Sequence, residues 1–185
     1  MIADVLDDAE DRMKKSIDAL QRELTAIRTG HAHTGLVDHV RVEYYGTATP
    51  LNQMATVAAP EARLLTIQPW DRTALGAIEK ALQKSDLGLT PSNDGTIIRL
   101  AIPPLTEQRR KDLIKVVHSR IEEGRVALRN IRRDSLEKLR RMTQAKEISE
   151  DDQHKGQDQL QKLTDRLIGQ VEQRGKDKEA ELSEV

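Results

Sequence analysis

Apolar residues recur at steps of three and four over residues 2–29, which places them on one stripe of a helix. The members of this stripe are Ile2, Leu6, Ala9, Met13, Ile17, Leu20, Leu24 and Ile27. No proline or glycine interrupts the segment before Gly30, which suits a helix C-cap. The pattern predicts a helix of about 28 residues, roughly 40 Å long, that needs partners of similar length.

The pattern changes after Gly30. Apolar and polar residues alternate in "VDHVRVEYYG", as they do in a half-buried strand. Three further strands are predicted at "QMATVAAP", "ARLLTIQP" and "TIIRLAI", and a turn at "PSNDG". A short helix capped by Asp71 is predicted at "DRTALGAIEKALQK". Residues 31–104 should therefore form a small α/β domain.

Two more helices are predicted after Pro103 and Pro104. The first covers residues 107–146, with a small polar residue, Ser135, at one core position. Its apolar spine consists of Ile114, Val117, Ile121, Gly124, Leu128, Ile131, Leu139 and Met142. The stretch "ISEDD" ends this helix and starts the next, because Ser149 and Asp152 have the spacing of a capping box.

These elements predict an α+β protein with an inserted domain. Residues 1–30 and 105–185 should form a long antiparallel three-helix bundle, with the β/α/β domain of residues 31–104 between its first two helices. The two links should lie side by side and act as a hinge. The hinge residues are predicted to be Gly30, His31, Pro103, Pro104, Leu105 and Thr106.

Charge is unevenly distributed, although the formal net charge is only -1. Residues 107–146 carry thirteen Lys and Arg against six Asp and Glu, whereas residues 147–185 carry six against eleven. A helical projection places most of the basic residues on one flank of the apolar spine, with Glu122 as the only carboxylate among them. These basic residues are Lys111, Lys115, His118, Arg125, Arg129, Arg132, Arg133 and Arg140.

This basic flank indicates binding to a phosphate polymer. The planar fork of arginine suits paired contacts with phosphate oxygens. With only two Tyr, one Trp and no Phe, the chain is poor in rings on which bases could stack, so structured RNA gripped through its backbone is favoured. The alternative is that the arginines are solvated and form weak ion pairs between helices.

Several other classes of function are disfavoured. The chain has no cysteine, no signal peptide and no apolar run long enough to cross a membrane. It contains no Gly-rich phosphate loop and no nucleophile elbow, and His31 and His33 fit loop residues better than a metal pair. We therefore expect a cytoplasmic protein that is not an enzyme and uses no metal, cofactor or membrane.

Four blocks of the chain closely resemble the bacterial ribosome recycling factor family. They begin at residues 23, 85, 103 and 125 and read "ELTAIRTGHAHTGLVDHVRVEYYGTATPLNQMATV", "SDLGLTPSNDG", "PPLTEQRRKDLIKVV" and "RVALRNIRRDS". The similarity extends over essentially all 185 residues. It implies an L-shaped, hinged protein with dimensions similar to those of a tRNA.

The resemblance also implies a function. Such factors bind rRNA of the large ribosomal subunit across the tRNA sites. With elongation factor G and GTP they split post-termination ribosomes into subunits, which frees mRNA and deacylated tRNA. We expect this chain to act in this way as a monomer. The competing interpretation is a helical scaffold or adaptor without RNA binding, which should not lose ribosome affinity steeply as salt rises.

The resemblance assigns residues as well. The rRNA contacts of the family match Arg132, Arg129, Arg110 and Arg28, and two further phosphate contacts are expected at Arg133 and Arg125. His31 stands where the family usually has an arginine, and a partly charged histidine weakens the phosphate contact expected there. The corner formed by Tyr44, Tyr45 and Gly46 fits strand-end packing and a turn, with a surface for elongation factor G as the alternative.

Overall fold

The computed structural model describes residues 1–184 and divides into two compact units. Unit 1 consists of Met1–Ile27 and Gln108–Glu184, and unit 2 consists of Arg28–Glu107. The predicted α+β class, with a small sheet-containing unit inserted into a helical one, is confirmed. Unit 2 begins three residues earlier and ends three residues later than the segment expected for the inserted domain.

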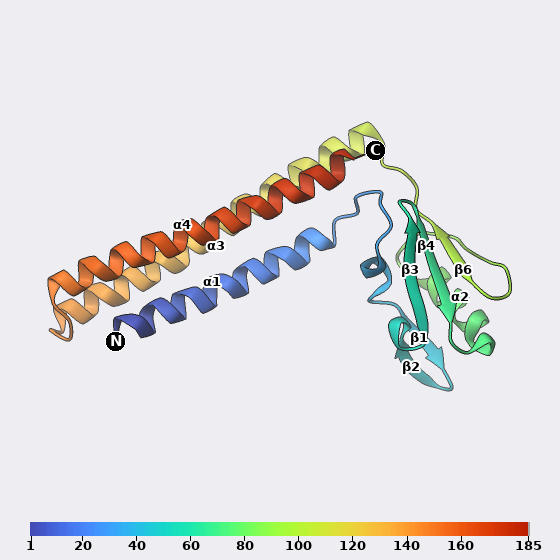
Figure 1. The fold of residues 1–185 in the computed structure, drawn as a ribbon, viewed down its shortest axis with the longest axis horizontal. Coiled ribbons are helices and arrows are strands. Elements are labelled where there is room, and N and C mark those ends of the chain that lie inside the picture. Colours follow the sequence, from blue (N-terminus) through green and yellow to red (C-terminus); the bar gives the residue numbers. More distant parts are fainter. Residues whose placement is uncertain (185) are drawn as a thin grey trace. The chain divides into compact units, whose positions relative to one another are not determined.

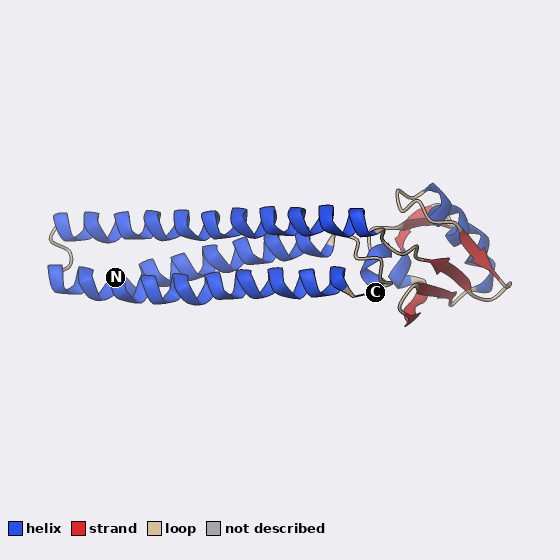
Figure 2. Ribbon diagram, turned by 90° about the horizontal axis from the view of Figure 1, so that it is seen from above, coloured by secondary structure: helices blue, strands red, loops and turns tan. Residues whose placement is uncertain are grey.

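Unit 1 is built from three long helices that lie alongside one another (Figures 1 and 2). They are α1 (Ile2–Thr25), α3 (Glu107–Gln144) and α4 (Glu150–Ser183). α1 and α4 run in the same direction, since Ile2 lies beside Gly156 and Arg174 donates a hydrogen bond to Gln21. α3 runs in the opposite direction, so the bundle is antiparallel as predicted.

The core of unit 1 is aliphatic, and glycines bring its helices close together. A Cβ atom at Gly124 would lie 3.1 Å from Leu20 Cδ2 and 3.2 Å from Val171 Cγ1, so all three helices meet there. The largest fully buried side chains of this core are Met13, Leu24, Leu128, Leu139 and Leu160. At the turn between α3 and α4 the predicted capping box is confirmed, because Ser149 and Asp152 each accept a main-chain hydrogen bond from the other.

The helix prediction is wrong in several details. α1 ends at Thr25 rather than near residue 29, because Ile27 N binds Leu24 O in a tighter turn and the chain then buries Thr29 and Gly30. Near the helix starts, Leu113 and Val5 are buried, whereas the predicted Ile114 and Leu6 are only partly buried, as is Met142 at the end of α3. These differences concern helix ends, where apolar spacing gives the least information.

Unit 2 contains two antiparallel sheets and one α-helix. Strands β1 (Arg41–Tyr44) and β2 (Thr47–Pro50) form a hairpin. The larger sheet has the order β3-β4-β6-β5, and its strands cover Ala55–Glu61, Leu64–Pro69, Ile98–Ala101 and Pro91–Asn93 in that order. Helix α2 (Leu75–Lys84) follows the short helix η3 (Arg72–Ala74), which Asp71 caps as predicted. Ile78 and Leu82 of α2 pack in one core with Leu65, Ile67, Ile98 and Leu100 of the sheet.

Strands β2 and β5 were not predicted. β2 pairs with β1 through the two-residue turn Tyr45-Gly46, where φ is +50° and +77°. Positive φ at both residues is the geometry of a tight hairpin turn. In "PSNDG", which we expected to be a turn, the first three residues form β5, and the turn begins only at Asp94.

The two links lie side by side within unit 2. Gly30 has φ +76°, and a Cβ atom there would lie 3.2 Å from the main-chain nitrogen of Leu105. Both links are also hydrogen-bonded to the turn between β3 and β4. Ala32 N donates to Ala62 O over 2.7 Å, and Ile102 N donates to Arg63 O over 2.8 Å. The chain therefore enters and leaves unit 2 at one place.

Candidate nucleic-acid interface

Two turns of α3 carry four of the six arginines expected to contact RNA. Arg125 and Arg132 are seven residues apart, and both reach towards α4. The opposite flank of α3 faces α1, where Asp134 accepts an ion pair from Arg12 over 3.2 Å. The basic flank of α3 therefore borders α4, and Arg129 and Arg133 are exposed beside it.

Arg132 is held by a neutral side chain. Its Nη1 donates a hydrogen bond to Oε1 of Gln161 in α4 over 2.9 Å. Gln161 Nε2 in turn donates to Asp165 Oδ1 over 2.8 Å. Within residues 1–184, Arg132 forms no ion pair with a carboxylate. The guanidinium is thus oriented while its positive charge stays uncompensated.

Two other arginines have the same type of partner. Arg133 Nη2 donates to the amide oxygen of Asn130 over 3.2 Å. Arg28, in unit 2, donates from Nη1 to the main-chain oxygen of Leu87 over 2.7 Å. Neither acceptor carries a formal charge, so both guanidiniums keep their attraction for an anion.

Arg125 differs from these three arginines. It donates to Glu122 over 2.8 Å and to Glu172 over 3.1 Å, and the hydrogen bond to Glu122 is the main cause that raises the pKa of Arg125. Arg129 has a looser partner, since Glu122 lies 3.9 Å away and half of its side chain is exposed. Of the four arginines in this stretch of α3, Arg125 has the closest carboxylate partners, whereas Arg132 and Arg133 form no ion pair within residues 1–184.

Glu122 is the carboxylate that α3 itself places on the basic flank, but the neighbouring helix adds others. α4 contributes Glu172, which pairs with Arg125, and Glu179, which contacts His118. A helical projection of α3 alone omits these groups, because they belong to a different helix. The partners of Arg132 and Arg133, Gln161 and Asn130, were also not recognised from the sequence.

Arg110 lies earlier on α3, about 22 Å before Arg125 at 1.5 Å per residue. Its Nε atom is buried and has no hydrogen-bond partner in the described part of the chain. The residue is only partly exposed, unlike Arg129 and Arg133. Arg110 therefore lies on α3 but outside the cluster formed by the other four arginines.

The residues expected to form a hinge line a small apolar pocket of unit 2. Its volume is about 160 Å³. Five of them contribute to it: Gly30, His31, Pro103, Pro104 and Leu105. The sixth, Thr106, directly precedes α3. Arg28 lines the same pocket, so it is placed by packing in unit 2 and not by the end of α1, where we expected it.

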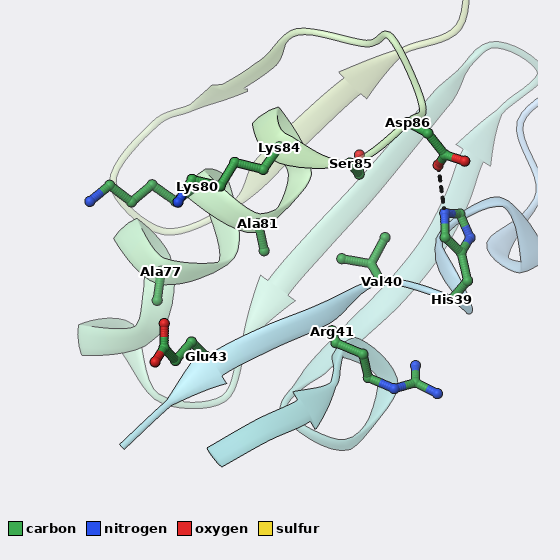
Figure 3. A pocket seen from close by; sticks show the side chains of 10 residues that line it. All are labelled: His39, Val40, Arg41, Glu43, Ala77, Lys80, Ala81, Lys84, Ser85 and Asp86. Atoms are coloured by element: carbon green, nitrogen blue, oxygen red, sulfur yellow. Dashed lines mark hydrogen bonds and ion pairs between the residues drawn. The ribbon is translucent and has the colours of Figure 1, made fainter. Parts of the chain in front are cut away.

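A larger groove of about 550 Å³ lies between α2 and β1 (Figure 3). Its lining is mixed in charge, and His39 and Asp86 point toward one another across a 3.0 Å contact. The basic residues at this groove, among them Lys80 and Lys84, are accompanied by Glu43 and Asp86. The groove therefore presents both signs of charge rather than a continuous basic surface.

In the tyrosine corner, Tyr44 is tied to the start of η3. The Tyr44 hydroxyl donates to Asp71 over 2.6 Å, and this hydrogen bond raises the pKa of Tyr44 to about 12. Tyr45, in the hairpin turn, is 84% exposed, and its ring packs edge-on against that of Tyr44. Tyr44 thus joins the hairpin to the cap of η3.

Neither a metal site nor a membrane-spanning helix is found in the part of the chain that the structure describes. In residues 1–184, no three His, Cys, Asp or Glu side chains come together in a way that could hold a metal ion. None of the helices in that range combines the length and the apolar character needed to cross a membrane.

The chain is similar to proteins of one known family. The ribosome recycling factor family matches residues 20–182. The chain is 59% identical over 181 residues to a ribosome-recycling factor of Solidesulfovibrio magneticus, with 98% of each chain covered. It is 54% identical over 185 residues to one of Dehalococcoides mccartyi, with both chains fully covered.

Solved structures agree with this result. The chain is similar to a ribosome recycling factor determined in solution, with a TM-score of 0.80, 39% identity and coverage of 100% and 98% of the two chains. It is also similar to the T. thermophilus ribosome recycling factor on the E. coli post-termination complex with E. coli elongation factor G. That match has a TM-score of 0.68, 46% identity and 98% coverage of each chain. The chain therefore belongs to the ribosome recycling factor family.

Proposed function

We propose that this chain binds rRNA of the large ribosomal subunit at the tRNA sites and, with elongation factor G and GTP, splits post-termination ribosomes into subunits. This action releases mRNA and deacylated tRNA for reuse. Members of the family are translation factors rather than enzymes, so the nucleotide chemistry belongs to the partner. The similar T. thermophilus factor, bound with elongation factor G to a post-termination complex, supports both partners.

One observation supports the rRNA contact most strongly. Arg132 and Arg133 are held by amide oxygens and not by carboxylates, on the flank of α3 that also carries Arg129. Uncompensated guanidiniums in fixed positions favour binding to phosphate oxygens. Arg28, held by a main-chain oxygen, and Arg110 are the further candidates for rRNA contacts.

The experiment that tests this function is ribosome splitting with purified components. Post-termination ribosomes are mixed with the protein, elongation factor G and GTP, and light scattering follows the appearance of free subunits. We expect splitting with the complete mixture and none when any one component is omitted. Splitting that proceeds equally well without the protein would refute the proposal.

A binding measurement separates this function from an adaptor role. Affinity for isolated large subunits is measured between about 50 and 200 mM salt. A protein that neutralises several phosphates loses affinity steeply over this range because counterions are released. An adaptor that does not contact RNA would show a flat dependence.

A further inference from the structure

We propose that Gln161 is a positioning residue: it fixes the Arg132 guanidinium for a phosphate contact while leaving its charge uncompensated. This inference rests on the proposed rRNA binding and adds to it a residue of α4. It starts from the 2.9 Å hydrogen bond between Arg132 Nη1 and Gln161 Oε1.

The orientation of the Gln161 amide is determined by its two partners. A guanidinium can only donate hydrogen bonds, so the amide oxygen must face Arg132. The amide nitrogen then points the other way and donates to Asp165 Oδ1, four residues further along α4, over 2.8 Å. Asp165 thus prevents the amide from turning its nitrogen towards the arginine.

Glutamate has nearly the same shape as glutamine and could orient Arg132 equally well. The feature that distinguishes Gln161 is therefore its lack of charge. An arginine paired with carboxylates already exists two turns away, where Arg125 is bound by Glu122 and Glu172. A carboxylate compensates the positive charge, and an external phosphate must then compete with it. An amide orients the long Arg132 side chain and so lowers the entropy cost of binding. Because it is neutral, it does not compete with the phosphate for the positive charge.

The decisive variant is therefore Gln161→Glu, which changes one atom of the amide and adds a negative charge. We expect its affinity for isolated large subunits to fall roughly ten- to hundredfold, comparable with Arg132→Ala. The slope of log affinity against log salt should also decrease by about one, because one phosphate contact is lost. Gln161→Met keeps the length but cannot accept a strong hydrogen bond. It should lose only a few-fold in affinity and keep the slope.

A matched control accounts for the added charge. Gln170 is exposed on α4 nine residues further on, so about 180° around the helix from Gln161. Gln170→Glu should change the affinity less than twofold if the effect requires contact with Arg132. In addition, Gln161→Glu should have no effect in a protein that already carries Arg132→Ala, because the two residues act through one contact.

The possible outcomes are distinguishable. Wild-type affinity and salt slope in Gln161→Glu would overturn the inference, since a merely structural partner would tolerate glutamate. The same holds if Gln170→Glu weakens binding equally. Failure of the proposed function itself would appear earlier, as wild-type protein that does not bind large subunits or binds them as well after Arg132→Ala.

Discussion

Gly175 of α4 faces Ile121 of α3 so closely that a Cβ atom on the glycine would lie 2.7 Å from Ile121 Cγ1. Ile121 is a buried, β-branched residue whose Cγ1 cannot swing aside freely. Two helices that approach this closely leave no space for a larger residue at this position.

We therefore expect Gly175→Ala to destabilise unit 1 by about 1–2 kcal/mol, because overpacking outweighs the gain in helix propensity. The free energy of unfolding is measured by urea denaturation, followed by circular dichroism at 222 nm. Gly169, which is exposed on the same helix with no atom within 4 Å of its potential Cβ, provides the control. Gly169→Ala should stabilise by about 0.5–1 kcal/mol, and an equal gain at Gly175 would contradict the prediction.

Ser135 is fully buried in α3, and its hydroxyl has no hydrogen-bond partner in residues 1–184. A buried polar group without a partner costs about 1–3 kcal/mol. Ser135→Ala removes this cost and should raise the free energy of unfolding by about 1 kcal/mol or more. Ser119→Ala, at an exposed position of the same helix, shows the gain due to helix propensity alone. Ser135→Ala should exceed it, and a loss of stability would show that the hydroxyl is hydrogen-bonded in solution.

The hydrogen bond from Tyr44 to Asp71 predicts a pH-dependent stability of unit 2. The pKa of Asp71 is lowered by hydrogen bonds from Thr73 and Tyr44, so its contribution is complete above about pH 4 and is lost as the pH falls. The pKa of Tyr44 is raised to about 12, so its contribution is complete below about pH 10 and is lost as the pH rises through about 12. Both contributions are complete between about pH 5 and pH 9.

Tyr44→Phe should accordingly lower the melting temperature of unit 2 at pH 7, and its difference from wild type should shrink below pH 4. The single tryptophan, Trp70, belongs to unit 2, so its fluorescence reports on that unit. Tyr45→Phe is the matched control, because it keeps the ring that packs on Tyr44. A difference for Tyr44→Phe that stays constant down to pH 2 would exclude the proposed role of Asp71.

The pairing of the arginines predicts a ranking of their effects on ribosome binding. Arg132→Ala and Arg129→Ala should each lower the affinity for large subunits by about 1–3 kcal/mol. Arg125→Ala should have a smaller effect, because Glu122 and Glu172 already compensate its charge. Binding of the three variants is compared at one salt concentration, with circular dichroism as a check of folding. An Arg125 effect as large as that of Arg132 would disprove the ranking.

The prolines of the second link should matter more for splitting than for binding. Proline restricts the backbone, so replacing Pro103 and Pro104 by alanine gives the link more freedom. We expect the double variant to bind large subunits within about twofold of wild type but to split ribosomes several-fold more slowly. Pro60→Ala, at an exposed position of β3, should behave like wild type in both assays. Equal losses of binding and splitting would argue against a specific role of this hinge in splitting.

The sequence was most informative where periodicity and local chemistry agree. The spacing of apolar residues predicted all three long helices, and Ser149 with Asp152 predicted the turn between α3 and α4. A turn was expected at Tyr44-Tyr45-Gly46, but the returning strand β2 was missed, because its residues, Thr47–Pro50, show no clear alternation of apolar and polar side chains. The end of α1 was misplaced because the contacts of Gly30 with Leu105 join residues far apart in the chain.

The site was only partly predictable for a similar reason. A helical projection placed Arg125 and Arg132 on one flank of α3 and could not show that one is bound by carboxylates and the other by an amide. The amide of Gln161 and one of the two carboxylates, Glu172, come from α4, so these contacts depend on the register of two antiparallel helices. Arg132 and Gln161 are almost equally far along the chain from the turn near residue 147. Residues at equal distances from such a turn face each other across the two helices, so their contact could have been inferred from the sequence.

The adjacency of Gly30 and Leu105 has a consequence for the order of folding. Helices α1 and α3 are separated by an insertion of roughly 80 residues, so pairing them in an unstructured chain would require closing a long loop. Once the insertion has folded, its ends meet, and the effective loop shrinks to a few residues. Loop-closure entropy then favours assembly of the helices by about 3 kcal/mol. Folding of unit 2 thereby brings α1 and α3 together and speeds the assembly of unit 1.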